Sequence, residues 1–278
     1  MIIDTHVHFW NYHPIKDAWI TSDMKAIQND FLPDDLISTL NENNVAGVIA
    51  IQADQSLKET EWLLELAKTY PFIKGVIGWV NLLDKNVDDI LKKYASNSVF
   101  KGVRHILQAE KEGFMLQPEF LNGIAKLEKY ALVYEILVFP NQLEEVISLV
   151  SQFPNQQFIL DHGAKPQVSK GLNDDWKDNL KALSAFDNVA VKLSGLVTEA
   201  ETYNSRNINF APFLKYIYDV FGEDRVMFGS DWPVCLLSCS YKEVKEIVKK
   251  FSINSISEQA MTNLWNKNAQ HIYKLSKN

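Results

Sequence analysis

The sequence predicts an α/β protein built as one (β/α)8 barrel, a TIM barrel. First, eight short segments rich in apolar and β-branched residues alternate with helical segments, as is typical of parallel βα units. Second, the 278 residues suit one such barrel, which takes about 250 residues. Third, no Gly-x-Gly-x-x-Gly motif follows a predicted strand, which argues against an open doubly wound sheet.

The predicted elements follow one another without a linker. Pro33 and Gly222 stand where helix starts and helix ends favour these residues. Residues 10–30 form a connection too long for a simple βα turn, which is typical of a functional loop. We expect one domain over residues 1–278, with the last two helices packed on the barrel. The expected strands are 2–9, 47–53, 73–80, 100–107, 132–139, 157–163, 189–195 and 225–231, and the expected helices are 33–43, 56–70, 87–95, 118–130, 141–153, 176–186, 212–222, 241–251 and 258–275.

The charge pattern excludes some classes of partner. The formal net charge is −7, and no basic run interrupts the mixed charges, so we expect neither nucleic acid nor an anionic membrane as a partner. There is no apolar stretch long enough to span a bilayer and no secretory leader, so we expect a cytoplasmic protein. Cys235 and Cys239 are expected to be reduced thiols. The sequence leaves a homo-oligomer open.

Two histidines end the first predicted strand. His6 and His8 are one residue apart, and strand side chains alternate between faces, so both imidazoles should point the same way. By the same alternation, Ile3, Thr5 and Val7 should face the other side. A His-x-His pair alone is also common as surface or core polarity, so its meaning depends on what other strands supply.

Further polar residues lie near the C-terminal ends of other predicted strands, where barrel enzymes carry their chemistry. Arg104 and His105 are neighbours, so only one can face the interior, and we favour Arg104. His162 either serves the site or bonds a backbone carbonyl. Glu135 and Lys192 either contact the substrate or form an internal ion pair. The remaining positions are Asp161, expected to be structural, Asp231 at the end of the last strand, and Trp79 and Trp232, which are core aromatics or substrate contacts.

Five segments, in order, resemble motifs of the sugar-lactonase group in the amidohydrolase superfamily (amidohydrolase-related family 2). That group includes fuconolactonases, rhamnonolactonases and pyrone-dicarboxylate lactonases. The resemblance extends from Met1 to about residue 275 and implies an amidohydrolase-type barrel. The segments are Ile-Ile-Asp-Thr-His-Val-His-Phe-Trp at 2–10, Lys-Gly-Val-Arg-His at 101–105, Asp-His-Gly-Ala-Lys-Pro at 161–166, Val-Lys-Leu-Ser-Gly-Leu at 191–196 and Phe-Gly-Ser-Asp-Trp-Pro-Val at 228–234.

The residues leave the metal question open. The superfamily's bridging lysine and its strand-five histidine are missing here, with Arg104 and Glu135 near those positions. At most one ion is therefore expected, and a neighbouring arginine would repel it. We favour catalysis without a metal, and the alternative is one Zn²⁺ ion. The ligands of that ion, which have the residue types and strand positions of a divalent-metal site, would be His6, His8, His162 and Asp231.

The resemblance implies a carboxylic-ester hydrolase of carbohydrate metabolism that opens a small lactone. Asp231 is expected to act as the general base on water, with the imidazoles of His6, His8 and His162 donating hydrogen bonds or positioning that water. Arg104 is expected to bind substrate oxygens, and the other substrate-contact candidates are Lys192, Glu135, Trp79 and Trp232. A sugar aldonolactone is favoured over a dicarboxylate, which would need several arginines. The alternatives are a metal-dependent decarboxylase, another hydrolase of the same group, and a barrel that binds a sugar acid without catalysis.

Overall fold

The computed structural model describes residues 1–275, so residues 276–278 of the expected domain lie outside the described part. Eight parallel strands form one sheet in the order β1 to β8. A parallel bridge between Val7 of the first strand and Trp232, just after the last strand, joins the two edges of the sheet, which confirms the barrel. The strands are β1 (Ile2–Val7), β2 (Val45–Ile51), β3 (Ile73–Gly78), β4 (Phe100–Ile106), β5 (Val133–Leu137), β6 (Phe158–Leu160), β7 (Val189–Leu193) and β8 (Val226–Phe228).

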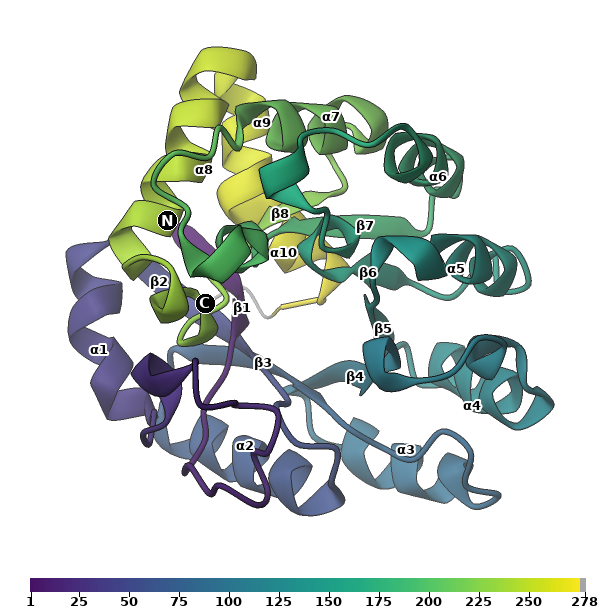
Figure 1. Cartoon of the computed structure of the whole chain (residues 1–278). Coiled ribbons are helices and arrows are strands. Elements are labelled where there is room, and N and C mark those ends of the chain that lie inside the picture. The colour runs from purple at the N-terminus through teal and green to yellow at the C-terminus, as the bar shows by residue number, and fades with distance from the viewer. Residues whose placement is uncertain (276–278) are drawn as a thin grey trace.

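The helices surround the strands in chain order, as Figure 1 shows in a view roughly along the barrel. Within the described residues, no helix is both long enough and apolar enough to span a bilayer. The helices are α1 (Pro33–Glu42), α2 (Leu57–Thr69), α3 (Val87–Ala95), α4 (Pro118–Lys129), α5 (Leu143–Val150), α6 (Asp174–Ser184), α7 (Ala211–Phe221), α8 (Tyr241–Ser255), α9 (Glu258–Thr262) and α10 (Asn268–Ile272).

The interior of the barrel changes from apolar to charged along the strands. Its N-terminal half is a cluster closed by Ala269 and Ile272 of α10 and by Tyr273. Two residues further along three strands, the alternating inward positions are Glu135, Asp161 and Lys192, which are fully buried. The barrel therefore has a packed floor below a charged layer. The strand residues of the apolar cluster are Ile3, Ile49, Ile51, Ile77, Val133, Ile159, Ala190 and Met227.

The structure corrects the expected alternation in β1. Ile3 packs in the inner cluster, whereas Val7 packs in the outer layer with the helices. The pairing of β1 with β2 shifts register between Asp4 and Val7, and such a bulge turns the side chains after it to the other face. Ile3 and Val7 therefore do not share a face, although His6 and His8 do meet.

All eight strands end one to three residues earlier than expected, β6 and β8 by three, and the last helix also ends early. β6 ends at Leu160 and β8 at Phe228, because the chain leaves the sheet where the polar residues begin. The expected helix over 258–275 is divided into α9, a π-helical turn at Asn263–Lys267, and α10. β2 begins two residues before its expected start, at Val45.

The long connection after β1 forms one wall of the barrel mouth. Trp10 pairs with Phe31 in an antiparallel bridge and packs in a small cluster with Ile20, Ile27 and Ala53. Trp19 lies on this connection with its ring edge-on to Trp10, at 5.8 Å between centroids. The connection is therefore ordered by its own aromatic core, beside the C-terminal ends of the strands.

Candidate active site

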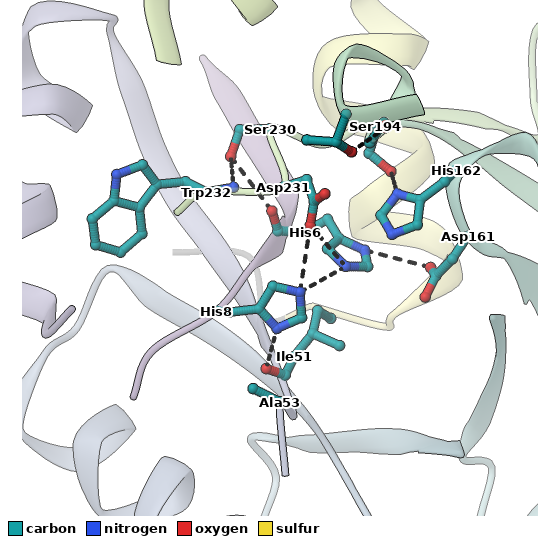
Figure 2. Close-up of polar contacts among 12 residues, drawn as sticks. His6, His8, Ile51, Ala53, Asp161, His162, Ser194, Ser230, Asp231 and Trp232 are labelled. Atoms are coloured by element: carbon teal, nitrogen blue, oxygen red, sulfur yellow. Dashed lines mark hydrogen bonds and ion pairs between the residues drawn. The ribbon is translucent and has the colours of Figure 1, made fainter. Parts of the chain in front are cut away.

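His6, His8, His162 and Asp231 meet at the C-terminal mouth of the barrel, and Figure 2 shows them around His6. The Nε2 atoms of His6 and His8 are 3.1 Å apart. Asp231 Oδ1 lies 3.7 Å from His6 Nε2 and 3.5 Å from His8 Nε2. The imidazole centroids of His6 and His162 are 4.5 Å apart. Residues far apart in the chain thus form one compact group.

A buried ionic chain supports His6 from below. Lys192 Nζ lies 3.1 Å from His6 Nδ1 and 3.0 Å from Asp161 Oδ1, and it is paired with Glu135. Tyr273, which follows α10, donates its hydroxyl to Glu135 Oε1 at 2.6 Å. The Glu135 and Lys192 side chains have no exposed surface. They therefore form the internal ion pair that was one of their two expected roles, and they do not reach the cavity.

Arg104 faces the interior as expected, but its guanidinium is fully engaged. Nη1 donates to Asp161 Oδ2 at 3.1 Å and lies 3.2 Å from His6 Nε2. Nη2 donates to both the backbone carbonyl and the side-chain oxygen of Gln52, and Nε donates to that side-chain oxygen. An arginine has five N–H donors, and these contacts occupy all the nitrogens. Arg104 thus holds the site together more than it offers donors to a ligand.

Asp161 is more central than the sequence suggested. It is completely buried and accepts from Arg104, and its Oδ1 lies 3.4 Å from His6 Nδ1. The positive charges of Lys192 and Arg104 and its contact with His6 outweigh burial, so the pKa of Asp161 is held well below its usual range. The ionised carboxylate links the cation layer to the imidazoles. Gln52 was also missed, although it is a polar residue at the end of the apolar second strand.

His105 and the two tryptophan candidates point away from the cluster. His105 stacks on Phe114 and bonds Glu110, and its Nδ1 accepts from Trp79 Nε1. Trp232 is buried against Phe9 and Phe31, and its indole projects away from the imidazoles in Figure 2. The structure therefore places Trp79 and Trp232 in the packing around the barrel, on the segments that follow β3 and β8.

Asp4 holds together the end of β1, which carries His6, and the segment after β8, which carries Asp231. Its Oδ1 accepts from the backbone N–H of His6 at 3.0 Å and of Ser230 at 2.9 Å, and its Oδ2 accepts from the Tyr241 hydroxyl at 2.9 Å. The Asp231 N–H donates to the His6 carbonyl at 2.9 Å. Asp231 has φ of 60°, so these contacts stabilise a left-handed backbone that directs its carboxylate into the mouth.

His162 is placed by a glycine on the next strand's loop. Its Nδ1 lies 2.8 Å from Ser194 Oγ. Gly195 follows with φ of 65°, and a Cβ there would come within 2.3 Å of His162 Nδ1. Any larger residue at position 195 would therefore displace the imidazole. This explains the Ser-Gly pair after β7.

Burial keeps the imidazoles neutral and the acid ionised. Burial lowers the pKa of His162 to about 4, and it also lowers the pKa values of His6 and His8. Burial opposes ionisation of Asp231, but the neighbouring imidazoles of His162, His8 and His6 outweigh it and hold the pKa of this carboxyl well below its usual range. At neutral pH the mouth thus contains imidazole bases and a carboxylate.

A cavity of about 330 Å³ opens above the cluster. His8, Arg104, His162 and Asp231 lie in its floor and walls. No sequence pattern indicated Trp19, Gln55 or Gln108 as wall residues, since their positions depend on how the loops fold over the mouth. Lys165 was visible only as part of the Asp-His-Gly-Ala-Lys-Pro segment. The remaining wall is largely apolar and comprises Ala53, Ile106, Ala109, Leu137 and Val234.

The donor atoms fit one divalent ion. His6 Nε2, His8 Nε2 and Asp231 Oδ1 are 3.1–3.7 Å from one another, and a tetrahedral zinc ion with ligand bonds of about 2.0–2.1 Å separates its ligand atoms by about 3.3 Å. His162 groups instead with His6 and Asp161, and its Nδ1 lies 2.8 Å from Ser194 Oγ. The expected set of four ligands is therefore divided into two overlapping triads that share His6.

Glu59 supports the cavity wall and gives a prediction for stability. Its buried carboxyl accepts from the backbone N–H groups of Ala53 and Asp54, and burial raises its pKa to about 7 from an ordinary value of 4.5. Between these values the folded protein keeps a proton that the unfolded chain releases. This group therefore lowers the free energy of unfolding as pH rises, by about 1 kcal/mol per pH unit.

We expect Glu59→Gln to remove this dependence. The difference in unfolding free energy, wild type minus variant, should decrease steadily between pH 4.5 and about 7. Urea unfolding at several pH values measures it. Parallel curves for the two proteins over this window would show that Glu59 is ionised throughout.

The fold and this cluster define a class: an α/β-barrel protein whose C-terminal mouth combines imidazoles and carboxylates suited to a divalent ion or an activated water. Residues 3–275 match the family model described as Amidohydrolase. The chain belongs to this amidohydrolase family, and the resemblance predicted from the sequence is confirmed.

The relatives cover nearly the whole chain. This chain is 34% identical to an L-fucono-1,5-lactonase of Burkholderia multivorans over 284 residues, an alignment that covers 98% of this chain and 96% of that protein. It is 30% identical to an L-fucono-1,5-lactonase of Burkholderia ambifaria over 237 residues, covering 85% and 81%. A crystal structure of an amidohydrolase from Burkholderia multivorans with bound zinc superposes with a TM-score of 0.96, at 34% identity, covering 99% and 100% of the two chains.

Proposed function

We propose that the protein hydrolyses the ester bond of a small sugar lactone, an aldonolactone. The observation that carries the proposal is an ionised carboxylate, Asp231, within 3.5 Å of the His8 imidazole at the base of a cavity of about 330 Å³. Its relatives from two Burkholderia species, named L-fucono-1,5-lactonases, support the substrate class. The product is the open-chain hydroxy acid.

Asp231 and His8 together suit a nucleophilic water. His8 Nδ1 donates to the Ile51 carbonyl at 2.9 Å, so its neutral ring presents a lone pair at Nε2. A water that donates one hydrogen to Asp231 and the other to His8 Nε2 directs its oxygen lone pair toward the ring carbonyl. Asp231 takes a proton as the water oxygen bonds to that carbon, so the oxygen never forms free hydroxide.

His162 suits the developing oxyanion. If the Ser194 hydroxyl donates to His162 Nδ1, the imidazole N–H is at Nε2 and faces the cavity. This N–H donates to the carbonyl oxygen as it becomes negative in the tetrahedral intermediate. The intermediate collapses with cleavage of the ring C–O bond, and Asp231 returns its proton to the leaving alkoxide. One water is added, and Asp231 ends ionised as it began.

A divalent ion, if bound, would be held by His6, His8 and Asp231. When bound, such an ion polarises a carbonyl and lowers the pKa of a coordinated water. Arg104, whose Nη1 lies 3.2 Å from His6 Nε2, places a positive charge beside that position and opposes a dication. Catalysis without a metal remains the alternative that we favour, in a cytoplasmic protein that acts on a neutral small molecule.

The proposal is tested with a pH-indicator assay on a panel of aldonolactones, before and after chelator treatment. We expect enzyme-dependent acid release from at least one of them. Acid release that survives metal removal supports activation of the water by Asp231 without a metal. Acid release that returns only with added zinc supports activation by a divalent ion. Binding of aldonolactones with no acid release would favour the non-catalytic alternative. Carbon dioxide from an aromatic carboxylate would favour the decarboxylase.

A further inference from the structure

We propose that Lys165, and not Arg104, is the cationic side chain that binds the substrate's oxygens. This inference rests on the proposed function, because it assigns how the same cavity holds an oxygen-rich lactone. Arg104 was the expected substrate-binding cation, yet contacts to Gln52, Asp161 and His6 occupy its nitrogens. A substrate oxygen could bind Arg104 only by replacing one of them, which would leave a buried partner unsatisfied.

The turn after β6 directs Lys165 into the cavity together with His162. The backbone is left-handed at four successive residues, with φ of 56° at His162, 55° at Gly163, 60° at Ala164 and 51° at Lys165. The Lys165 N–H donates to the His162 carbonyl at 2.9 Å. Such a turn has three residues per turn, so side chains at its first and fourth positions lie on the same side.

This backbone is costly and must be held by its surroundings. A left-handed conformation is unfavourable for every residue other than glycine, and three of the four residues are not glycine. The Trp176 indole donates to the Gly163 carbonyl at 2.9 Å, and His162 contacts Ser194. Strain of this kind is concentrated at functional sites, and here its result is that both His162 and Lys165 line the cavity.

The ammonium group of Lys165 is oriented without being saturated. Its Nζ lies 3.0 Å from Glu199 Oε1, and the two side chains are 21% and 17% exposed. Nζ also lies 5.9 Å from the centre of the Phe139 ring. A lysine has three N–H donors, and among the described residues Glu199 is its one ion-pair partner. Donors therefore remain for a ligand, on a side chain whose direction is already fixed.

The chemistry of this group suits a hydroxyl-rich lactone. An ammonium group donates to hydroxyl or ring oxygens without demanding the paired acceptors that a guanidinium recognises. Contacts to oxygens remote from the reacting carbonyl hold the ground state and the transition state equally. Lys165 is therefore expected to affect KM and to leave kcat nearly unchanged.

The test compares Lys165→Met, Lys165→Arg and, as matched control, Lys170→Met, which removes an exposed lysine of the same loop. We expect Lys165→Met to raise KM for the best aldonolactone about tenfold or more, the scale of one charge-assisted hydrogen bond. kcat should change by less than about threefold. Lys165→Arg should recover part of the loss, and Lys170→Met should match wild type. An unchanged KM, or a loss confined to kcat, in Lys165→Met overturns the proposal.

A binding measurement separates this proposal from the proposed function. Calorimetry with an aldonolactone and with its aldonate is made on wild type and on Lys165→Met, and thermal melting verifies that the variant is folded. If wild type hydrolyses no lactone, but Lys165→Met binds the sugar more weakly than wild type does, the catalytic proposal fails and the assignment of Lys165 stands. If the variant does not fold, Glu199→Gln, which releases the ammonium from its partner, is expected to raise KM severalfold. Equal binding by wild type and a folded variant contradicts the assignment.

Discussion

Asp231→Asn is expected to lower kcat by about 10²–10⁴-fold while the protein remains folded. The asparagine has nearly the same shape as the aspartate, so the backbone bond between residue 231 and the His6 carbonyl is kept. What is lost is the group that takes a proton from water and returns it to the alkoxide. The low pKa of Asp231 means that the wild-type group is ionised and ready for that role at neutral pH.

The control for this variant is Asp174→Asn, which makes the same change at an exposed acid that begins α6. It should have wild-type kcat and KM. Melting temperatures of the two variants establish that neither is unfolded. Near wild-type turnover by Asp231→Asn would refute its assignment as the base.

Lys192→Met is expected to have the largest effect on stability. It removes the cation that is paired with Glu135 and lies 3.0 Å from Asp161, and all three side chains are completely buried. Removing one partner of a buried ion pair costs about 3–5 kcal/mol, because the other charge stays buried without compensation. Urea unfolding at neutral pH measures this loss.

The pH dependence of this loss is part of the prediction. Burial already raises the pKa of Glu135 in the wild type, and without Lys192 it should rise further. The folded variant then keeps a proton that the unfolded chain releases, so the destabilisation should shrink as pH falls. Lys192→Met combined with Glu135→Gln should recover part of the loss at neutral pH. A double variant less stable than Lys192→Met would contradict this account.

The barrel and most of its polar layer could be predicted from the sequence, because both follow from local pattern. Strand alternation correctly brought His6 and His8 together and sent Arg104 inward, away from His105. Alternation failed within β1, where a register shift that depends on pairing with β2 separates Ile3 from Val7. No local sequence pattern predicts such a register shift.

The contacts that decide each residue's role come from distant parts of the chain. Gln52 on the segment after β2 saturates Arg104, and the sequence of β4 alone cannot indicate this. Lys165 reaches the cavity because of a left-handed turn that non-glycine residues rarely adopt. Asp161 appeared structural because its partners on β1, β4 and β7 are visible only once the strands are arranged in a barrel.

The position of an oxygen label tests the central claim most directly. When the best lactone is hydrolysed in ¹⁸O-labelled water, with the enzymatic rate far above the spontaneous one, mass spectrometry of the fragmented product locates the label. Attack of water on the ring carbonyl, assisted by Asp231, predicts one labelled oxygen in the new carboxylate and none in the released hydroxyl. Label in the hydroxyl, with an unlabelled carboxylate, would contradict it.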